Sequence, residues 1–76
     1  MPVIHRLGPF VIRVFTRDHL PVHVHVDAGD FVARVFLDGS VEVIRGKAPA
    51  GFGAAVEWVL ANHTIIMATW DRTRPQ

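Results

Sequence analysis

Valine alternates with polar residues along the segment 22–27, which reads VHVHVD, and this is the clearest pattern in the chain. Successive side chains of a β-strand point to opposite faces of a sheet. The pattern therefore predicts a strand with its three valines on one face and with His23, His25 and Asp27 on the other.

Runs of β-branched and aromatic residues on both sides of this segment are also typical of strands. Short loops join them, and the last loop contains Asp38-Gly39, a dipeptide that favours a hairpin turn between antiparallel strands. The sequence predicts a meander of four strands, at about residues 10–16, 21–27, 31–37 and 40–45.

Beyond residue 49 the apolar residues recur every three or four positions, as they do along one face of an amphipathic helix. We predict one helix at about residues 51–70, followed by a polar tail at residues 71–76. A break near Asn62 is the alternative, because Asn62-His63-Thr64 could cap a helix and β-branched residues follow it.

These elements predict an α+β fold, a four-stranded antiparallel β-meander with one C-terminal helix packed on one face, in two layers. A chain of 76 residues is expected to form a single domain over residues 1–76. The valine face would meet the helix. By the parity of the strands, the opposite face would combine the polar residues His23, His25, Asp27, Arg13 and Arg34 with the apolar residues Val11, Phe15, Val32 and Phe36.

The composition narrows the function classes. With 8 Lys+Arg against 7 Asp+Glu, the formal net charge is +1, which is far from that of a protein that grips nucleic acid by bulk charge. The absence of cysteine excludes disulfides, and no apolar run is long enough to span a membrane, so we expect a cytoplasmic protein. Hydrophobic residues make up 50% of a short chain, more than one small core can hold, and this predicts a homo-oligomer, most simply a dimer.

The three histidines at positions 19, 23 and 25 are the first candidates for chemistry, because imidazole is both a general acid/base near neutral pH and a common metal ligand. His23 and His25 project from the same side of one strand, and His19 could reach them from the preceding loop. Three interpretations stay open: a metal site of His19, His23 and His25, proton transfer by His23 and His25, or an exposed pair without chemistry. No cofactor is predicted.

Arg13 and Arg34 would supply a positive field beside these histidines, suited to a phosphate or a carboxylate, unless they are ordinary solvated arginines. His63 lies on the apolar stripe of the predicted helix, which favours a place at the edge of the core. Trp58 and Trp70 are interpreted as packing anchors, and Glu57 as solvated.

Residues 18–26 have the pattern DH-x-P-x-H-x-HV, which is specific in its spacing of histidine and proline. On this pattern the chain resembles the small bacterial domain of unknown function family numbered 4160, and the resemblance covers nearly the whole chain. Val22 replaces a usual proline, and Thr64-Ile65-Ile66 replaces usual charged helix formers. The motif positions are Asp18, His19, Pro21, His23, His25, Glu57, Trp58, His63 and Trp70.

The resemblance implies a component of a toxin–antitoxin-like gene pair and assigns no catalytic role to any motif residue. We therefore expect a module that contacts a small cognate protein or RNA through the His/Arg face of the sheet. The alternatives are a metal-independent ribonuclease, with His23 and His25 as acid and base and with Arg34 or Arg13 stabilising the phosphorane, and a structural homodimer without chemistry.

Overall fold

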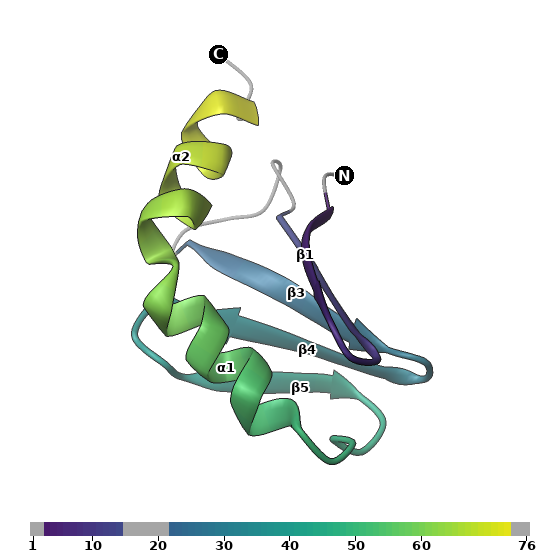
Figure 1. The fold of residues 1–76 in the computed structure, drawn as a ribbon. Helices are drawn as coiled ribbons and strands as arrows, with labels where there is room; N and C mark the ends of the chain where they lie inside the picture. Colours follow the sequence, from purple (N-terminus) through teal and green to yellow (C-terminus); the bar gives the residue numbers. More distant parts are fainter. Residues whose placement is uncertain (1–2, 15–21, 74–76) are drawn as a thin grey trace.

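The computed structural model describes residues 3–14 and 22–73, and it has an antiparallel sheet followed by two helices (Figure 1). The strands and helices within these residues are β1 (Val3–Leu7), β2 (Phe10–Arg13), β3 (His23–Ala28), β4 (Phe31–Phe36), β5 (Val41–Arg45), α1 (Phe52–Ala61) and α2 (His63–Thr73).

The strand order in the sheet is β1-β2-β3-β4-β5, and all neighbours are antiparallel, so the predicted α+β meander is confirmed. The prediction of four strands is wrong, because β1 adds a fifth at the edge beside β2. β1 was missed because it is short, contains His5 and Arg6, and has a β-bulge between Val3 and His5 that interrupts its alternation.

The Asp38-Gly39 hairpin is confirmed between β4 and β5. The Phe36 amide donates to the Ser40 carbonyl at 2.9 Å, and the Gly39 amide donates to the Phe36 carbonyl at 3.0 Å. Gly39 has a φ of 91°, in the left-handed region that glycine adopts without steric cost. The turn residues therefore fix the register of β5 against β4.

Both helices lie on one side of the sheet and cover the face on which the valines of β3 lie (Figure 1). Alternate residues of β2, β3 and β4 are buried there, as the period of two requires. Among the described residues the buried apolar core consists of Phe10, Ile12, Val14, Val24, Val26, Ala28, Phe31, Ala33, Val35, Ala55, Val59, Ile66 and Trp70.

The prediction of one continuous helix is wrong, since α1 ends at Ala61 and α2 begins at His63. Asn62 forms the joint. Its amide N–H donates to the Val59 carbonyl at 3.2 Å, its side-chain Nδ2 donates to the Trp58 carbonyl at 2.8 Å, and its own carbonyl accepts from Ile66 at 3.1 Å. The break is the alternative that Asn62 indicated, and α2 continues to Thr73, into the predicted polar tail.

The break changes the position of His63. A continuous helix would place it on the apolar stripe between Val59 and Met67, but as the first residue of α2 it is exposed. The expectation that His63 lies at the edge of the core is therefore wrong. No helix within the described residues is long and apolar enough to cross a membrane.

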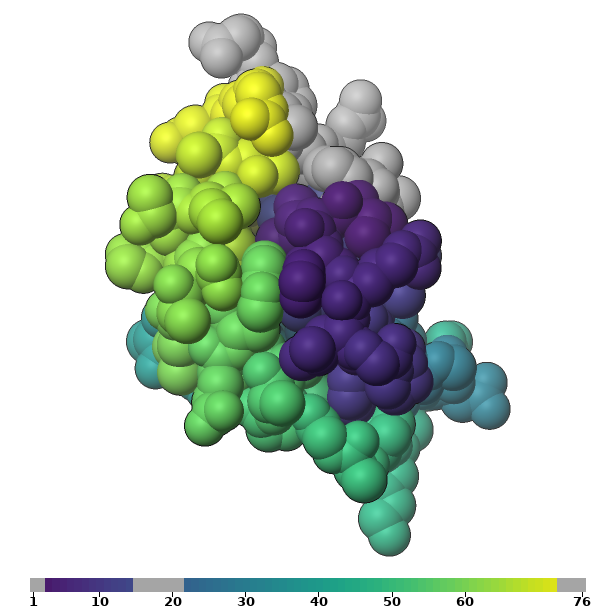
Figure 2. Space-filling view, in the orientation of Figure 1, coloured from purple at the N-terminus to yellow at the C-terminus, as the bar shows by residue number. Residues whose placement is uncertain are grey.

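α1 packs against the edge strand β1 through two aromatic rings. The His5 and Trp58 rings are stacked with centroids 4.3 Å apart and planes 4° from parallel. Figure 2 shows the corresponding surface, with the residues of β1 in purple beside those of α1 in green. Trp58 thus anchors α1 to the strand that the sequence prediction missed.

Gly46, directly after β5, provides a stability test. Its φ is 80°, and a Cβ at this position would lie 2.8 Å from the Asp30 carbonyl oxygen. Gly29 has a φ of 60° with nothing within 4 Å of its Cβ position, so it serves as the matched control. We expect Gly29→Ala to lower the free energy of unfolding by about 1 kcal/mol and Gly46→Ala by at least about 2 kcal/mol. Urea denaturation measures both, and equal losses would contradict the steric argument.

Candidate functional site

A row of polar side chains crosses the sheet on the face away from the helices. Arg13 of β2 is opposite His25 of β3, His25 is opposite Arg34 of β4, and Arg34 is opposite Glu42 of β5. Neighbouring strands are about 5 Å apart, so these side chains follow one another at that spacing. Sequence parity predicted the two arginines and the histidine on one face, and the register places them in one line.

A second row lies beside the first and includes apolar residues. Val11 of β2 is opposite Asp27 of β3, which is opposite Val32 of β4. All three are partly buried. We use the name open face for the surface made by both rows: Val11, Arg13, His25, Asp27, Val32, Arg34 and Glu42.

Each arginine of the open face has a carboxylate partner within the chain. Arg13 Nη1 lies 3.6 Å from Asp27 Oδ2, and Arg34 Nη1 donates to Glu42 Oε1 at 2.5 Å. The side chains of both arginines stay more than a third exposed. Arg13 and Arg34 are therefore each paired with a carboxylate, while Arg6 opposite Val11 and Arg45 opposite Val32 extend the second row at its two ends.

His23 shares the parity of His25 but not its surroundings, because it is buried, with 6% of its surface exposed. Its ring centroid lies 5.5 Å from that of His25, 5.1 Å from Phe36 and 6.4 Å from Trp70 of α2. The last turns of α2 thus reach the start of β3. Trp70 acts as the packing anchor that the sequence predicted, and it is 1% exposed.

The remaining motif positions do not gather at the open face. Asp18, His19 and Pro21 lie outside the described residues, as does Phe15. Glu57 and His63 are exposed on the helices, and Trp58 contacts β1. Within residues 3–14 and 22–73 no group of three His, Asp or Glu residues could hold a metal ion, and the proposed third ligand, His19, is outside these ranges.

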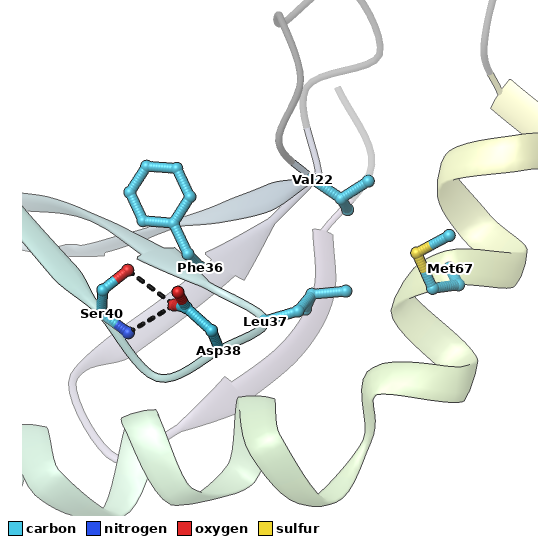
Figure 3. A pocket seen from close by; sticks show the side chains of 6 residues that line it. All are labelled: Val22, Phe36, Leu37, Asp38, Ser40 and Met67. Atoms are coloured by element: carbon cyan, nitrogen blue, oxygen red, sulfur yellow. Dashed lines mark hydrogen bonds between the residues drawn. The ribbon is translucent and has the colours of Figure 1, made fainter.

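A pocket of about 480 Å³ lies at the end of the sheet next to His23. In Figure 3, Val22 and Leu37 point toward Met67 of α2. On the opposite side Asp38 Oδ1 accepts hydrogen bonds from the Ser40 hydroxyl at 2.6 Å and the Ser40 amide at 2.8 Å. These two bonds lower the pKa of Asp38 from its ordinary value of 3.8. The pocket is lined by Val22, Phe36, Leu37, Asp38, Ser40 and Met67.

Glu42 and His5 make contacts in the structure but were not singled out from the sequence. Glu42 completes the polar row, and its place depends on the register of β5, which the hairpin turn sets. The alternation of Glu42 with valines was a signal that could have placed it opposite Arg34. His5 carried no such signal, because its partner Trp58 is far away in the sequence.

Comparison with known families gives one match. The model of a family described as a domain of unknown function (DUF4160) matches residues 10–71, from the start of β2 into α2. This confirms the resemblance drawn from the sequence, and β1 lies before the matched range. Comparisons with the curated proteins and with the solved structures find no match.

The different burial of the two histidines predicts different costs of substitution. We expect His23→Ala to lower the free energy of unfolding by about 2 kcal/mol, because it leaves a cavity beside Phe36 and Trp70. His25→Ala, at a half-buried surface position, should cost less than about 1 kcal/mol. Urea unfolding measures both values, and a cost at His25 equal to that at His23 would show that the open face is packed as tightly as the sheet end.

The hydrogen bonds to Asp38 in the turn predict that the stability of the folded chain depends on pH. The pKa of this carboxyl is lowered in the folded chain, so its stabilising contribution is complete above the ordinary value of 3.8 and is lost as the pH falls through the folded pKa. Asp38→Asn keeps an acceptor oxygen and removes the titration. We expect the urea midpoints of the two proteins to converge as the pH falls below 3.8. A constant difference across that range would contradict the assignment.

Proposed function

The chain belongs to the DUF4160 family, a domain of unknown function, and from this premise we propose that it is a protein-contacting module of a toxin–antitoxin-like gene pair. The open face of the sheet is its contact surface. The gene-pair context comes from the family resemblance, and the choice of surface comes from the geometry of this chain.

One observation carries the proposal: the row Arg13–His25–Arg34–Glu42, with the half-buried Val11 and Val32 beside it, lies on the sheet face away from both helices. Arginine is enriched at protein interfaces, where its planar group pairs with carboxylates and its stem packs on apolar atoms. A mixed apolar and charged surface of this kind suits another folded protein.

The pairing of the charges favours a protein over RNA as the partner. Asp27 and Glu42 lie beside the two arginines at ion-pair distance, so a phosphate approaching either arginine also meets a carboxylate. Nucleic-acid binding gains most of its affinity from cations that neutralise phosphates. A protein surface can instead present an acid to each arginine and a base to each carboxylate.

The ribonuclease alternative receives less support from the geometry. A general acid and a general base must both reach the atoms of one substrate. His25 lies on the open face, whereas His23 is buried against Phe36 and Trp70. A substrate on the open face would meet one of the two imidazoles and not the other.

The test is a titration of the chain with the small protein encoded by the neighbouring gene, produced separately and followed by calorimetry. We expect Arg13→Glu to weaken binding by at least about tenfold, because it places a second carboxylate beside Asp27 and reverses the charge offered to the partner. Lys47→Glu makes the same change of charge in the exposed segment after β5 and should leave the affinity unchanged.

The same proteins should be titrated with a fluorescent single-stranded RNA at low and moderate salt. Tight, salt-dependent RNA binding that Arg13→Glu abolishes would overturn the proposal in favour of an RNA contact. Equal effects of Arg13→Glu and Lys47→Glu on protein binding would remove the open face from the interaction. Circular dichroism of each variant confirms that it is folded.

A further inference from the structure

The two edges of the sheet are protected to different degrees. The edge strand β1 contacts α1 through the stacked His5 and Trp58 rings. All five residues of β5 are exposed, and within the described residues no strand pairs with its outer side. An exposed edge presents unpaired backbone N–H and C=O groups, which are a template for a further strand.

β5 also exposes apolar side chains. Val41 is 39% exposed, Val43 is 52% exposed and Ile44 is 46% exposed. Leu60 of α1, which is 43% exposed, adds to them, because its methyl groups lie 3.6 and 3.7 Å from the Cβ position of Gly39 in the turn that leads into β5. The free edge thus has an apolar strip made of these four exposed side chains, and burial of such a strip favours association.

The backbone of β5 has amide groups that point away from β4, toward the free edge of the sheet. The Phe36 amide bonds the Ser40 carbonyl, so residues 36 and 40 are a hydrogen-bonded pair. Such pairs alternate along an antiparallel ladder with pairs whose N–H and C=O groups point outward. The Val35–Val41 and Ala33–Val43 pairs are of the outward kind, so the amides of Val41 and Val43 face the free edge.

The charges of β5 are complementary to those of an identical strand. A β-bulge separates the Val32–Arg45 and Ala33–Val43 pairs, and because of it Glu42 and Arg45 lie on the same face of the sheet although they are three residues apart. In an antiparallel pair of β5 strands centred between Val43 and Ile44, each Glu42 is opposite the partner's Arg45. In this register Val43 of each strand is opposite the partner's Ile44, so the segments between the two ion pairs have equal lengths.

We infer that β5 pairs antiparallel with β5 of a second copy of the chain in this register, so that a twofold axis joins two five-stranded sheets edge to edge. The ladder satisfies the outward amides of Val41 and Val43, the apolar strip is covered, and two Glu42–Arg45 ion pairs flank the axis. This interface follows the edge of β5 and shares Glu42 with the open face. The substitutions Arg13→Glu, on β2, and Val43→Lys, on β5, test the two proposals separately.

Sedimentation equilibrium over the micromolar range tests the pairing, and we expect the mass of two chains. Val43→Lys should weaken the dimer by at least about tenfold, because each substitution acts twice across the axis and lysine at an edge opposes pairing. Ile65→Lys is the matched control, since Ile65 is 53% exposed on α2, and it should leave the dimer unchanged. A monomer throughout the range, or equal weakening by both variants, would overturn the inference.

Exchanging the charges of residues 42 and 45 tests the register of the β5–β5 pair. Glu42→Arg and Arg45→Glu should each weaken the dimer by about tenfold, because like charges then face each other at both ends. Both single variants also lose contacts within the chain, to Arg34 and to the Asp30 carbonyl. The double variant keeps those losses but restores opposite charges across the axis, and its affinity should return to within about threefold of the original. No recovery would show that this register is wrong.

Hydrogen exchange on the unaltered chain supplies a measurement that needs no variant. The amides of Val41 and Val43 should exchange more slowly as the protein concentration rises, because they become hydrogen-bonded only in the dimer. The amide of Glu42, which belongs to a hydrogen-bonded pair with Arg34, is the internal reference. Protection of Val41 and Val43 that does not depend on concentration would contradict the pairing.

Discussion

The burial of one face of the sheet under two short helices is the interaction on which the other features of the molecule depend. Alternate residues of β2, β3 and β4 form the core with Ala55, Val59, Ile66 and Trp70 of the helices. Since the period of a strand is two, filling this face with valine, isoleucine and phenylalanine also decides which residues lie on the other. A slip of one residue in β3 would bury His25 and Asp27 and expose two valines. The register of the polar row is thus held by the core and not by the ion pairs within the row.

The break at Asn62 divides the helical layer into two helices that contact different strands of the sheet. α1 lies against β1 through Trp58 and covers the middle of the core with Val59. α2 starts in a new direction and brings Trp70 to the start of β3, where its ring contacts that of His23. Trp70 of α2 and Phe36 of β4 thus pack on His23, which is buried, whereas His25 is only half-buried.

The strand alternation and the Asp38-Gly39 turn were sufficient to predict the meander and to place Arg13, His25 and Arg34 on one face, because both signals are local. What the sequence did not reveal arises from contacts between distant residues. β1 is stabilised by pairing with β2 and by Trp58, so its own pattern is weak. The burial of His23 depends on its contact with Trp70, which is distant in the sequence. The exposure of His63 follows from the break between the helices, and the apolar residues continue at helical spacing across this break, so the sequence pattern favoured one continuous helix.

The pairing of charges on the open face is compatible with binding because each pair is weak. An exposed ion pair contributes about 0–1 kcal/mol, and the Arg13 and Arg34 side chains are 38% and 40% exposed. Exchanging Asp27 or Glu42 for a partner's carboxylate therefore costs little. Both arginines also keep a buried Nε without a hydrogen-bond partner among the described residues, so a rotation that exposes Nε to an acceptor gains a bond. The strands hold the positions of the charges while the side chains remain free to exchange partners, and such a surface obtains its specificity from the pattern of charge rather than from its amount.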